Sequence, residues 1–179
     1  PRHAGDAGVT NLNQRLRMAL NPAKRGIAEM NLAGAVVREG DRIMVVKNDY
    51  QNGVFNGDVG KVSRIDQRAK EVEIKIHEEK SALPRLIRYP FKDASKMLRL
   101  SYAQTVHKSQ GQEYDVIVIP VMRSFGRQLQ RNLYYTGITR AKKKAILVGT
   151  RDALAQAVRN DKANQRNTFL KQRLQKLLD

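Results

Sequence analysis

The sequence predicts an α/β domain that is interrupted by a small, antiparallel β-rich insertion. Continuous apolar runs at residues 115–120 (DVIVIP) and 145–149 (AILVG) predict strands buried on both faces, which is typical of a parallel sheet covered by helices. Before these runs, short apolar stretches are separated by Asn52-Gly53 and Asn56-Gly57. Asn-Gly favours tight hairpin turns, so this earlier part is expected to be antiparallel.

The first predicted element is an amphipathic helix of about three turns, over TNLNQRLRMALNP at residues 10–22. Its apolar positions recur at helical spacing and are Leu12, Leu16, Ala19 and Leu20. Thr10 is a candidate N-cap. Asn21-Pro22 is a stop signal, because proline cannot continue a helix.

The β-rich insertion follows, and we expect it at residues 38–97. Its apolar stretches are RIMVV, VGKVSRI, EVEIKI and RLIRYPF. A segment of this length is too long for an ordinary loop and regular enough to fold as a subdomain, most simply as a small barrel. The α/β domain is then assembled from residues 1–37 and 98–179.

The remaining elements belong to the α/β domain. A helical stretch, QLQRNLYYTGITRAKK, lies between the two apolar strands. The tail, from about Asp152, predicts two further helices. The second of these carries Leu170, Leu174, Leu177 and Leu178. Tyr102, Tyr134 and Tyr135 are interpreted as core residues.

The charge of the chain favours a polyanionic partner. Its 179 residues include 34 Lys+Arg against 17 Asp+Glu, a net charge of +17, which exceeds what solubility requires. No acidic residue lies between Val116 and Arg151, whereas the basic residues there are Arg123, Arg127, Arg131, Arg140, Lys142, Lys143, Lys144 and Arg151. A solvated basic face is the competing interpretation. Aromatic residues are only 6% of the chain, so limited base stacking is expected.

Other features of the composition exclude several classes of protein. No apolar run approaches the ~18 residues of a membrane span, and no N-terminal signal pattern is present, so a cytoplasmic protein without a membrane partner is predicted. The absence of cysteine excludes disulfides and thiolate metal sites. The histidines are too scattered for zinc, and no metal site is predicted.

A phosphate loop of the form G-x-x-x-x-G-K-[ST] is missing. The segment NGDVGKVS comes nearest, but Phe55 occupies the position of the first glycine, and Val62 follows Lys61 where a hydroxyl is required. No carboxylate pair ends an apolar strand, so no residue here clearly holds Mg²⁺. The chain is expected not to hydrolyse a nucleotide by itself.

Arg140 is the first candidate catalytic residue. It lies at the end of a predicted helix and just before the strand AILVG, where its planar guanidinium suits bidentate contact with phosphate. Supplied across a cleft, such a side chain can act as an arginine finger. The alternative is that Arg140 is only one more member of the basic cluster.

Two longer segments resemble helicase motifs. LSYAQTVHKSQGQEYDVIVIP (residues 100–120) and LYYTGITRAKKKAILVG (residues 133–149) resemble motifs V and VI of superfamily 1 helicases, specifically the RecD-like branch. The resemblance extends to DAGVTNLNQRL, NDYQNGVFNGDVGKV and LAQAVRNDKANQRNTFLKQRL, and thus covers nearly the whole chain. It implies the second RecA-like motor domain of an ATP-dependent 5′–3′ DNA helicase, with a parallel sheet flanked by helices and an inserted SH3-like β-barrel.

The same resemblance implies a partner and the cofactors. In this family the first RecA-like motor domain carries the phosphate loop and the magnesium carboxylate, so it would bind most of ATP and Mg²⁺. Arg140 would reach the γ-phosphate from the second domain. Gly111 and Glu113 match motif V positions that line the nucleotide cleft, with Glu113 accepting from the ribose hydroxyl. A surface carboxylate that offsets Lys108 is the alternative for Glu113.

The resemblance also implies contacts with single-stranded DNA. Thr105, His107 and Lys108 lie in motif V, whose hydroxyl, imidazole and ammonium groups can bind phosphate oxygens without reading base identity. Asn56 matches a family position in the insertion, although an Asn-Gly turn is explained by hairpin geometry alone. Without the resemblance, His107 would be interpreted as a packing or capping residue.

Two other functions remain open from the sequence. One is a stand-alone single-stranded nucleic-acid-binding module without motor activity, and the other is a related motor that acts on RNA. Pro1 lacks a preceding methionine, which favours a piece of a longer protein and hence the motor.

Overall fold

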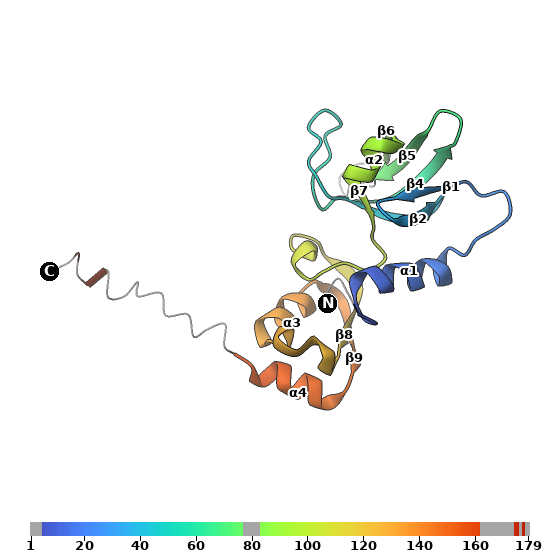
Figure 1. Cartoon of the computed structure of the whole chain (residues 1–179). Coiled ribbons are helices and arrows are strands. Elements are labelled where there is room, and N and C mark those ends of the chain that lie inside the picture. The colour runs from blue at the N-terminus through green and yellow to red at the C-terminus, as the bar shows by residue number, and fades with distance from the viewer. Residues whose placement is uncertain (1–4, 77–82, 162–173, 176, 178–179) are drawn as a thin grey trace. The chain divides into compact units, whose positions relative to one another are not determined.

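The computed structural model describes residues 5–76, 83–161, 174–175 and 177. The chain divides into two compact units, Pro1–Lys108 and Ser109–Asp179 (Figure 1). Both predicted ends of the insertion, at residues 38 and 97, lie inside the first unit, and those boundaries stay predictions.

The first unit begins with helix α1 (Val9–Leu20), which confirms the predicted helix and its end at Asn21. The N-cap is wrong, however: Gly8 occupies that position, and no side chain caps the helix. The predicted apolar face is also incomplete, because Leu20 is 69% exposed, whereas Asn13 is 5% exposed. A polar side chain is therefore the buried residue of α1.

Two antiparallel sheets form the rest of the first unit. β1 (Glu29–Leu32) pairs with β2 (Ala35–Arg38) as a hairpin. The second sheet has the order β6-β5-β4-β3-β7. Its strands are β3 (Arg42–Val45), β4 (Val59–Asp66), β5 (Glu71–Ile76), β6 (Arg85–Pro90) and β7 (Leu98–Leu100). The predicted antiparallel subdomain is thus confirmed, as an open SH3-like arrangement rather than a closed barrel.

Alternation along the strands builds one hydrophobic core. In β5, Val72, Ile74 and Ile76 are buried while the charged residues between them are not, as expected for a half-buried strand of β-branched residues. The core cluster also receives Met30, Leu32 and Val37 from the β1–β2 hairpin. Helix α2 (Phe91–Met97) covers it with Ala94. The hairpin before residue 38 therefore packs with the β-rich part.

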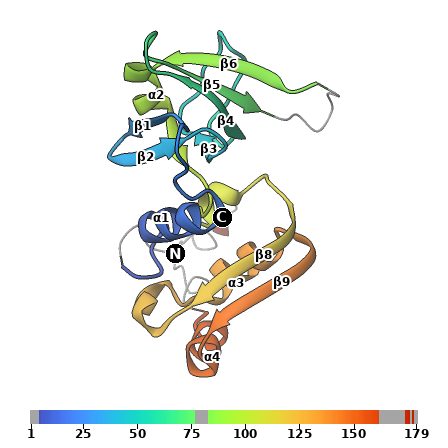
Figure 2. The same ribbon diagram turned by 90° about the vertical axis from the view of Figure 1, so that its right-hand side faces the viewer.

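The second unit is built around two parallel strands, β8 (Tyr114–Val121) and β9 (Ala141–Gly149). Between them lie the 3₁₀ segment η2 (Arg123–Gln128) and helix α3 (Arg131–Ile138), and helix α4 (Arg151–Arg159) follows β9 (Figure 2). The predicted parallel pairing, the intervening helix and the first tail helix are confirmed. The second tail helix falls mainly on residues 162–173, outside the described residues.

The prediction that both strands are buried on two faces is wrong. Ile119 and Val121 are buried, but Val116 and Val118 are 52% and 61% exposed. The reason is that, in the described part of the second unit, the sheet has two strands, and α3 contacts both of them. Tyr134 is buried as predicted, whereas Tyr135 is 68% exposed.

Within the described ranges, no helix combines the length and the apolar character that crossing a membrane requires.

Candidate nucleotide and nucleic-acid sites

Arg140 lies in the short turn between α3 and β9, where its backbone is anchored on both sides. Its N–H donates to the carbonyl oxygen of Gly137 at 3.1 Å, and its own carbonyl oxygen accepts from Tyr114 N–H at 2.9 Å. The end of α3 and the start of β8 therefore both hold this residue. An anchored backbone limits the positions that the side chain can reach.

The guanidinium of Arg140 is poorly satisfied by its own unit. The side chain is half-buried, and its Nε is buried without a hydrogen-bond partner. One Nη2 contact reaches Thr139 Oγ1 at 3.5 Å, and no ion pair to a carboxylate forms within the described ranges. Because arginine stays charged in proteins, a half-buried guanidinium without a carboxylate is suited to an anion from outside the unit.

Gly111 and Glu113, the other predicted nucleotide residues, lie on the connection into β8. Gly111 has a φ of +81°, and a Cβ built there would meet no atom within 4 Å. Its backbone conformation therefore favours glycine, although space does not demand it. Glu113 is exposed and lies 3.6 Å from Lys142 Nζ, so the partner of this carboxylate is Lys142.

Thr105 lies just before the 3₁₀ turn η1 (His107–Ser109), which contains His107 and Lys108. Lys108 N–H donates to Thr105 Oγ1 at 3.2 Å, so the threonine hydroxyl helps to shape the turn. His107 and Lys108 are exposed, whereas Thr105 is half-buried. Two hydrogen-bond donors, the side chains of His107 and Lys108, thus face solvent within the segment 100–120 that resembles motif V.

Asn13, which the sequence analysis missed, fixes the backbone just before this turn. Its Oδ1 accepts from the N–H groups of Tyr102 and Ala103 at 2.7 and 3.0 Å, and its Nδ2 donates to the carbonyl oxygen of Ala103 at 2.8 Å. Asn13 therefore holds residues 102–103 as a neighbouring strand would. The only sign in the sequence that Asn13 is buried is its place between Leu12 and Leu16, one residue after the first and three before the second.

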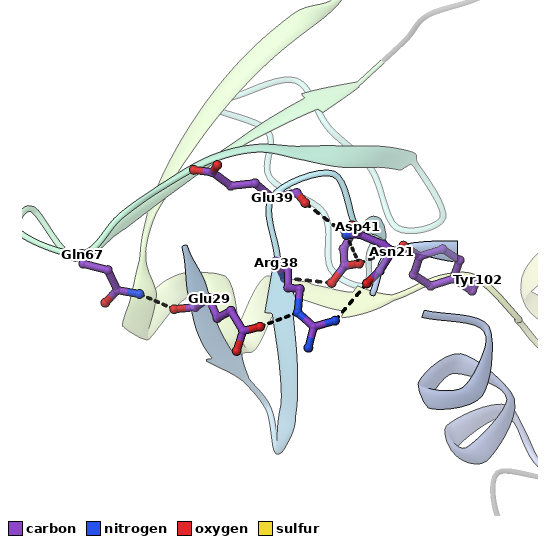
Figure 3. A network of polar contacts seen from close by, with 7 residues as sticks. All are labelled: Asn21, Glu29, Arg38, Glu39, Asp41, Gln67 and Tyr102. Carbon is purple, nitrogen blue, oxygen red and sulfur yellow. Dashed lines mark hydrogen bonds and ion pairs between the residues drawn. The ribbon is translucent and has the colours of Figure 1, made fainter. Parts of the chain in front are cut away.

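Asp41 is the second residue that the sequence analysis missed, and it is fully buried. Its Oδ2 accepts from Arg38 N–H at 2.8 Å, and its Oδ1 accepts from Asn21 Nδ2 at 2.7 Å and from Tyr102 Oη at 2.8 Å. Figure 3 shows these groups converging between the end of α1, the β2–β3 turn and the segment that carries Tyr102. The carboxylate thus ties together three segments that are far apart in sequence.

Arg38 extends the same polar network. Its Nε pairs with Glu29 Oε1, and its Nη1 donates to the carbonyl oxygen of Asn21 at 2.9 Å (Figure 3). Burial raises the pKa of the Tyr102 phenol to about 12, and its hydrogen bond to Asp41 acts in the same direction. Tyr102 therefore stays a neutral donor at physiological pH.

Asn56 lies in the loop between β3 and β4, where its backbone has a structural role. Its N–H donates to Asn48 Oδ1 at 2.8 Å, and the following Gly57 has a φ of +109°. The Asn-Gly pair therefore shapes the loop, while the Asn56 side chain itself is exposed.

The basic cluster of the second unit is partly neutralised. Ion pairs join Arg123 to Asp152 at 2.7 Å and Lys143 to Asp115 at 2.7 Å, and another joins Arg131 to Asp161 at 3.2 Å. The acidic partners come from outside the basic stretch, so the sequence pattern overstated its charge. Within the described residues no three or more metal-binding side chains gather in one place.

Two protein-family models match the chain. Residues 12–76 match the ATP-dependent RecD-like DNA helicase SH3 domain. Residues 100–148 match the UvrD-like helicase C-terminal domain. The first match lies over the antiparallel sheets, and the second contains the turn with Lys108, the β8–α3–β9 segment and Arg140.

The chain is also similar in sequence to curated proteins of the RecD type. The chain is 30% identical to the ATP-dependent RecD2 DNA helicase of Deinococcus radiodurans over 174 residues, which are 97% of this chain and 22% of that protein. It is also 30% identical to the RecBCD enzyme subunit RecD of Mycobacterium tuberculosis over 129 residues, 66% of this chain and 19% of that protein. The chain thus spans about a fifth of the length of these relatives.

Solved structures of Bacteroides Pif1 share the fold. The structure with ADP-AlF3 and single-stranded DNA aligns with a TM-score of 0.58 at 17% identity, over 97% of this chain and 44% of that chain. A second structure, bound to single-stranded DNA, aligns with a TM-score of 0.52 at 17% identity, over 80% of this chain and 39% of that one. These alignments agree with a RecA-like parallel sheet accompanied by an SH3-like antiparallel part.

Proposed function

This chain belongs to the RecD-like helicases of superfamily 1, with which it shares the C-terminal region, and on that premise we propose that it is the second motor domain of an ATP-dependent 5′–3′ DNA helicase. Its partner is the first RecA-like domain of the same parent chain. The observation that carries the proposal is the half-buried Arg140 guanidinium, whose Nε has no hydrogen-bond partner.

Arg140 acts as the arginine finger in this proposal. The phosphoryl-transfer transition state spreads negative charge over the equatorial oxygens of the γ-phosphate, and an arginine supplied from a second domain stabilises that charge. The backbone contacts of Arg140 to Gly137 and Tyr114 fix the Cα from which the side chain extends, and so limit the positions that the guanidinium can reach.

Gly111 and Glu113 line the nucleotide cleft from the same unit. Glu113 accepts a hydrogen bond from the ribose hydroxyl, and its exposed ion pair with Lys142 is weak enough to be exchanged for that contact. The described residues offer no carboxylate cluster for Mg²⁺. We therefore assign Mg²⁺ and the phosphate loop to the first motor domain, and expect this chain alone to be inactive as an ATPase.

Thr105, His107, Lys108 and Asn56 form part of the track for single-stranded DNA. Hydroxyl, imidazole, ammonium and amide groups can hold phosphate oxygens without reading the bases, as a translocating motor requires. The charge of Lys108 adds affinity that salt weakens, because phosphate binding releases counterions. ATP binding closes the cleft between the two motor domains, Arg140 completes the catalytic site, and the closure moves this grip along the strand until hydrolysis releases it.

The proposal is tested on the full parent protein, with the first motor domain present. Arg140→Ala should lower the DNA-stimulated kcat of ATP hydrolysis by roughly 10³-fold or more, the range typical of arginine fingers. Arg140→Lys should restore little of it, because an ammonium lacks the planar fork. Binding of single-stranded DNA, measured by anisotropy, should stay unchanged in both variants.

Arg127→Ala is the matched control, since Arg127 is an exposed arginine of the same unit for which the described residues provide no ion pair. It should leave kcat within about twofold of wild type. If Arg140→Ala also hydrolyses ATP within a few-fold of wild type, the finger assignment fails, and the stand-alone binding module becomes the better description.

A further inference from the structure

Tyr50 and Phe55 form an exposed aromatic pair on the β3–β4 loop of the first unit. Their side chains are 77% and 49% exposed, and their ring centroids lie 6.1 Å apart with an interplanar angle of 77°. The loop projects away from the sheet, in cyan in Figure 1. The two rings meet edge to face, and much of their surface is open to water. Such an exposed aromatic pair is unusual in a chain that has few aromatic residues.

The loop beneath the rings is fixed by its own polar groups. Asp49 and Val54 exchange two backbone hydrogen bonds, of 2.8 and 3.0 Å. The Asp49 carboxylate accepts from Asn52 Nδ2 and from Tyr89 Oη, each at 2.8 Å. The Asn52 hydrogen bond is the main reason that the pKa of Asp49 is lowered. Val54 is 1% exposed and anchors the loop to the core.

Further contacts fix the aromatic residues themselves. Asp58 Oδ2 accepts from Phe55 N–H at 2.8 Å, and Asn48 Nδ2 donates to Tyr50 Oη at 3.1 Å. Arg85 Nη1 reaches over the loop tip and donates to the carbonyl oxygen of Asn52 at 3.1 Å. The rings are thus held outward by an ordered loop, so their exposure is not the result of a loose tip.

The charge around the pair favours a strand of nucleic acid as the occupant. Both carboxylates of the loop, Asp49 and Asp58, are directed to donors of the loop and the sheet. Lys47 is an exposed residue of the same loop, Arg85 donates to the loop tip, and the whole chain carries +17. A ligand that offers both anionic groups and flat apolar faces matches this combination, and single-stranded nucleic acid has both.

We propose that Tyr50 and Phe55 form a base-stacking platform for single-stranded DNA on the SH3-like part of the chain. The rings stack on bases regardless of sequence, because every base has a π-face. This inference rests on the proposed function only for the identity of the ligand. It adds a contact to the bases, whereas Thr105, His107, Lys108 and Asn56 are assigned to the backbone.

The experiment compares two strands of equal length and charge, oligo-dT and an oligomer of abasic sites, by fluorescence anisotropy with the full chain. The double variant Tyr50→Ala/Phe55→Ala should weaken oligo-dT binding by about fivefold or more and leave abasic binding unchanged. Tyr135→Ala removes a comparably exposed tyrosine (68%, against 77% for Tyr50) from the second unit and should change neither affinity.

A second variant covers the case in which the double variant does not fold. The chain contains no tryptophan, so Tyr50→Trp supplies a single indole whose fluorescence stacking bases quench. Oligo-dT should quench it, and the bound abasic strand should not. Equal quenching by both strands, unchanged oligo-dT affinity of the double variant, or equal losses for both strands would each overturn the platform.

The outcomes separate this inference from the proposed function. If the wild-type chain binds neither strand, the platform and the proposed DNA track both fail. If the platform result holds while Arg140→Ala retains ATPase activity in the parent protein, the motor proposal fails and the platform stands. If Arg140→Ala is inactive but oligo-dT affinity does not depend on Tyr50 and Phe55, only the platform fails.

Discussion

Replacement of Asp41 tests whether the buried polar network holds the first unit together. Asp41 is fully buried, and its carboxylate accepts hydrogen bonds from Arg38 N–H, Asn21 Nδ2 and Tyr102 Oη. Asp41→Ala removes the acceptor and leaves those three donors without it. Asp41→Ala should therefore lower the free energy of unfolding by more than a substitution of an exposed residue in this unit.

The magnitude follows from these contacts. A hydrogen bond to a charged group contributes ~1.5–3 kcal/mol, so three such bonds amount to roughly 5–9 kcal/mol before any offset. Alanine also removes the cost of keeping the carboxylate out of water, which is several kcal/mol. The free energy of unfolding should fall by about 3–5 kcal/mol. Tyr102→Phe, which removes one donor, should lower it by about 1–2 kcal/mol.

The assay is urea unfolding of the full chain, followed by hydrogen exchange so that the segments around residues 41–46 and 98–104 are measured separately. Asp93→Ala is the control, because Asp93 forms an exposed i,i+3 pair with Lys96 at 3.4 Å and should cost under about 1 kcal/mol. If Asp41→Ala is as stable as Asp93→Ala, the network does not stabilise the unit and the reasoning is refuted.

Two further predictions concern pH and close packing. Burial raises the pKa of Tyr102 from 10.0 to about 12, so the stability that this group contributes is complete below pH 10 and is lost as the pH rises towards 12. In urea unfolding at several pH values, the free energy of unfolding should decline less steeply with pH for Tyr102→Phe than for wild type. Parallel declines would contradict this. A Cβ at Gly149 would lie 1.8 Å from the Val121 carbonyl oxygen, so Gly149→Ala should destabilise the second unit by about 3 kcal/mol or more. Gly34→Ala, which meets only open space at a φ of +86°, should cost about 1–2 kcal/mol, and equal thermal shifts for the two would show that β8 and β9 do not approach so closely.

The sequence predicted those elements whose signal is local. The apolar runs of β8 and β9, the alternation in β5 and the Asn-Gly turns each lie within a few residues, and the structure has the corresponding strands and loop. Burial of Asn13 and Asp41 could not be predicted in this way. Each satisfies groups that lie far along the chain, 90 residues away for Asn13 and Ala103 and 61 for Asp41 and Tyr102.

The same limit explains the errors at the strands of the second unit. Continuous apolar runs predict burial on both faces only if other segments cover those faces, and periodicity does not say which segments do so. Val116 and Val118 belong to such an apolar run, yet they are exposed within the described residues, because no described segment covers them. For the candidate site, the sequence identified Arg140 as a cation next to a strand. Only the structure shows that its Nε is buried without a hydrogen-bond partner.

On the proposed function, the division of the chain separates the residues assigned to DNA from those assigned to the nucleotide. Ser101, Tyr102 and Ala103 are tied into the first unit by Arg42, Asn13 and Asp41, and the proposed strand contacts follow on the same unit. Arg140, Gly111 and Glu113 belong to the second unit.

The two sets of residues therefore meet along the chain between Lys108 and Gly111, inside the segment that resembles motif V. Upstream of this connection, residues 101–103 are held by hydrogen bonds to Arg42, Asn13 and Asp41, and a rearrangement of that segment would break those bonds. On the proposed function, the network around Asn13 and Asp41 therefore holds the segment that immediately precedes the DNA contacts.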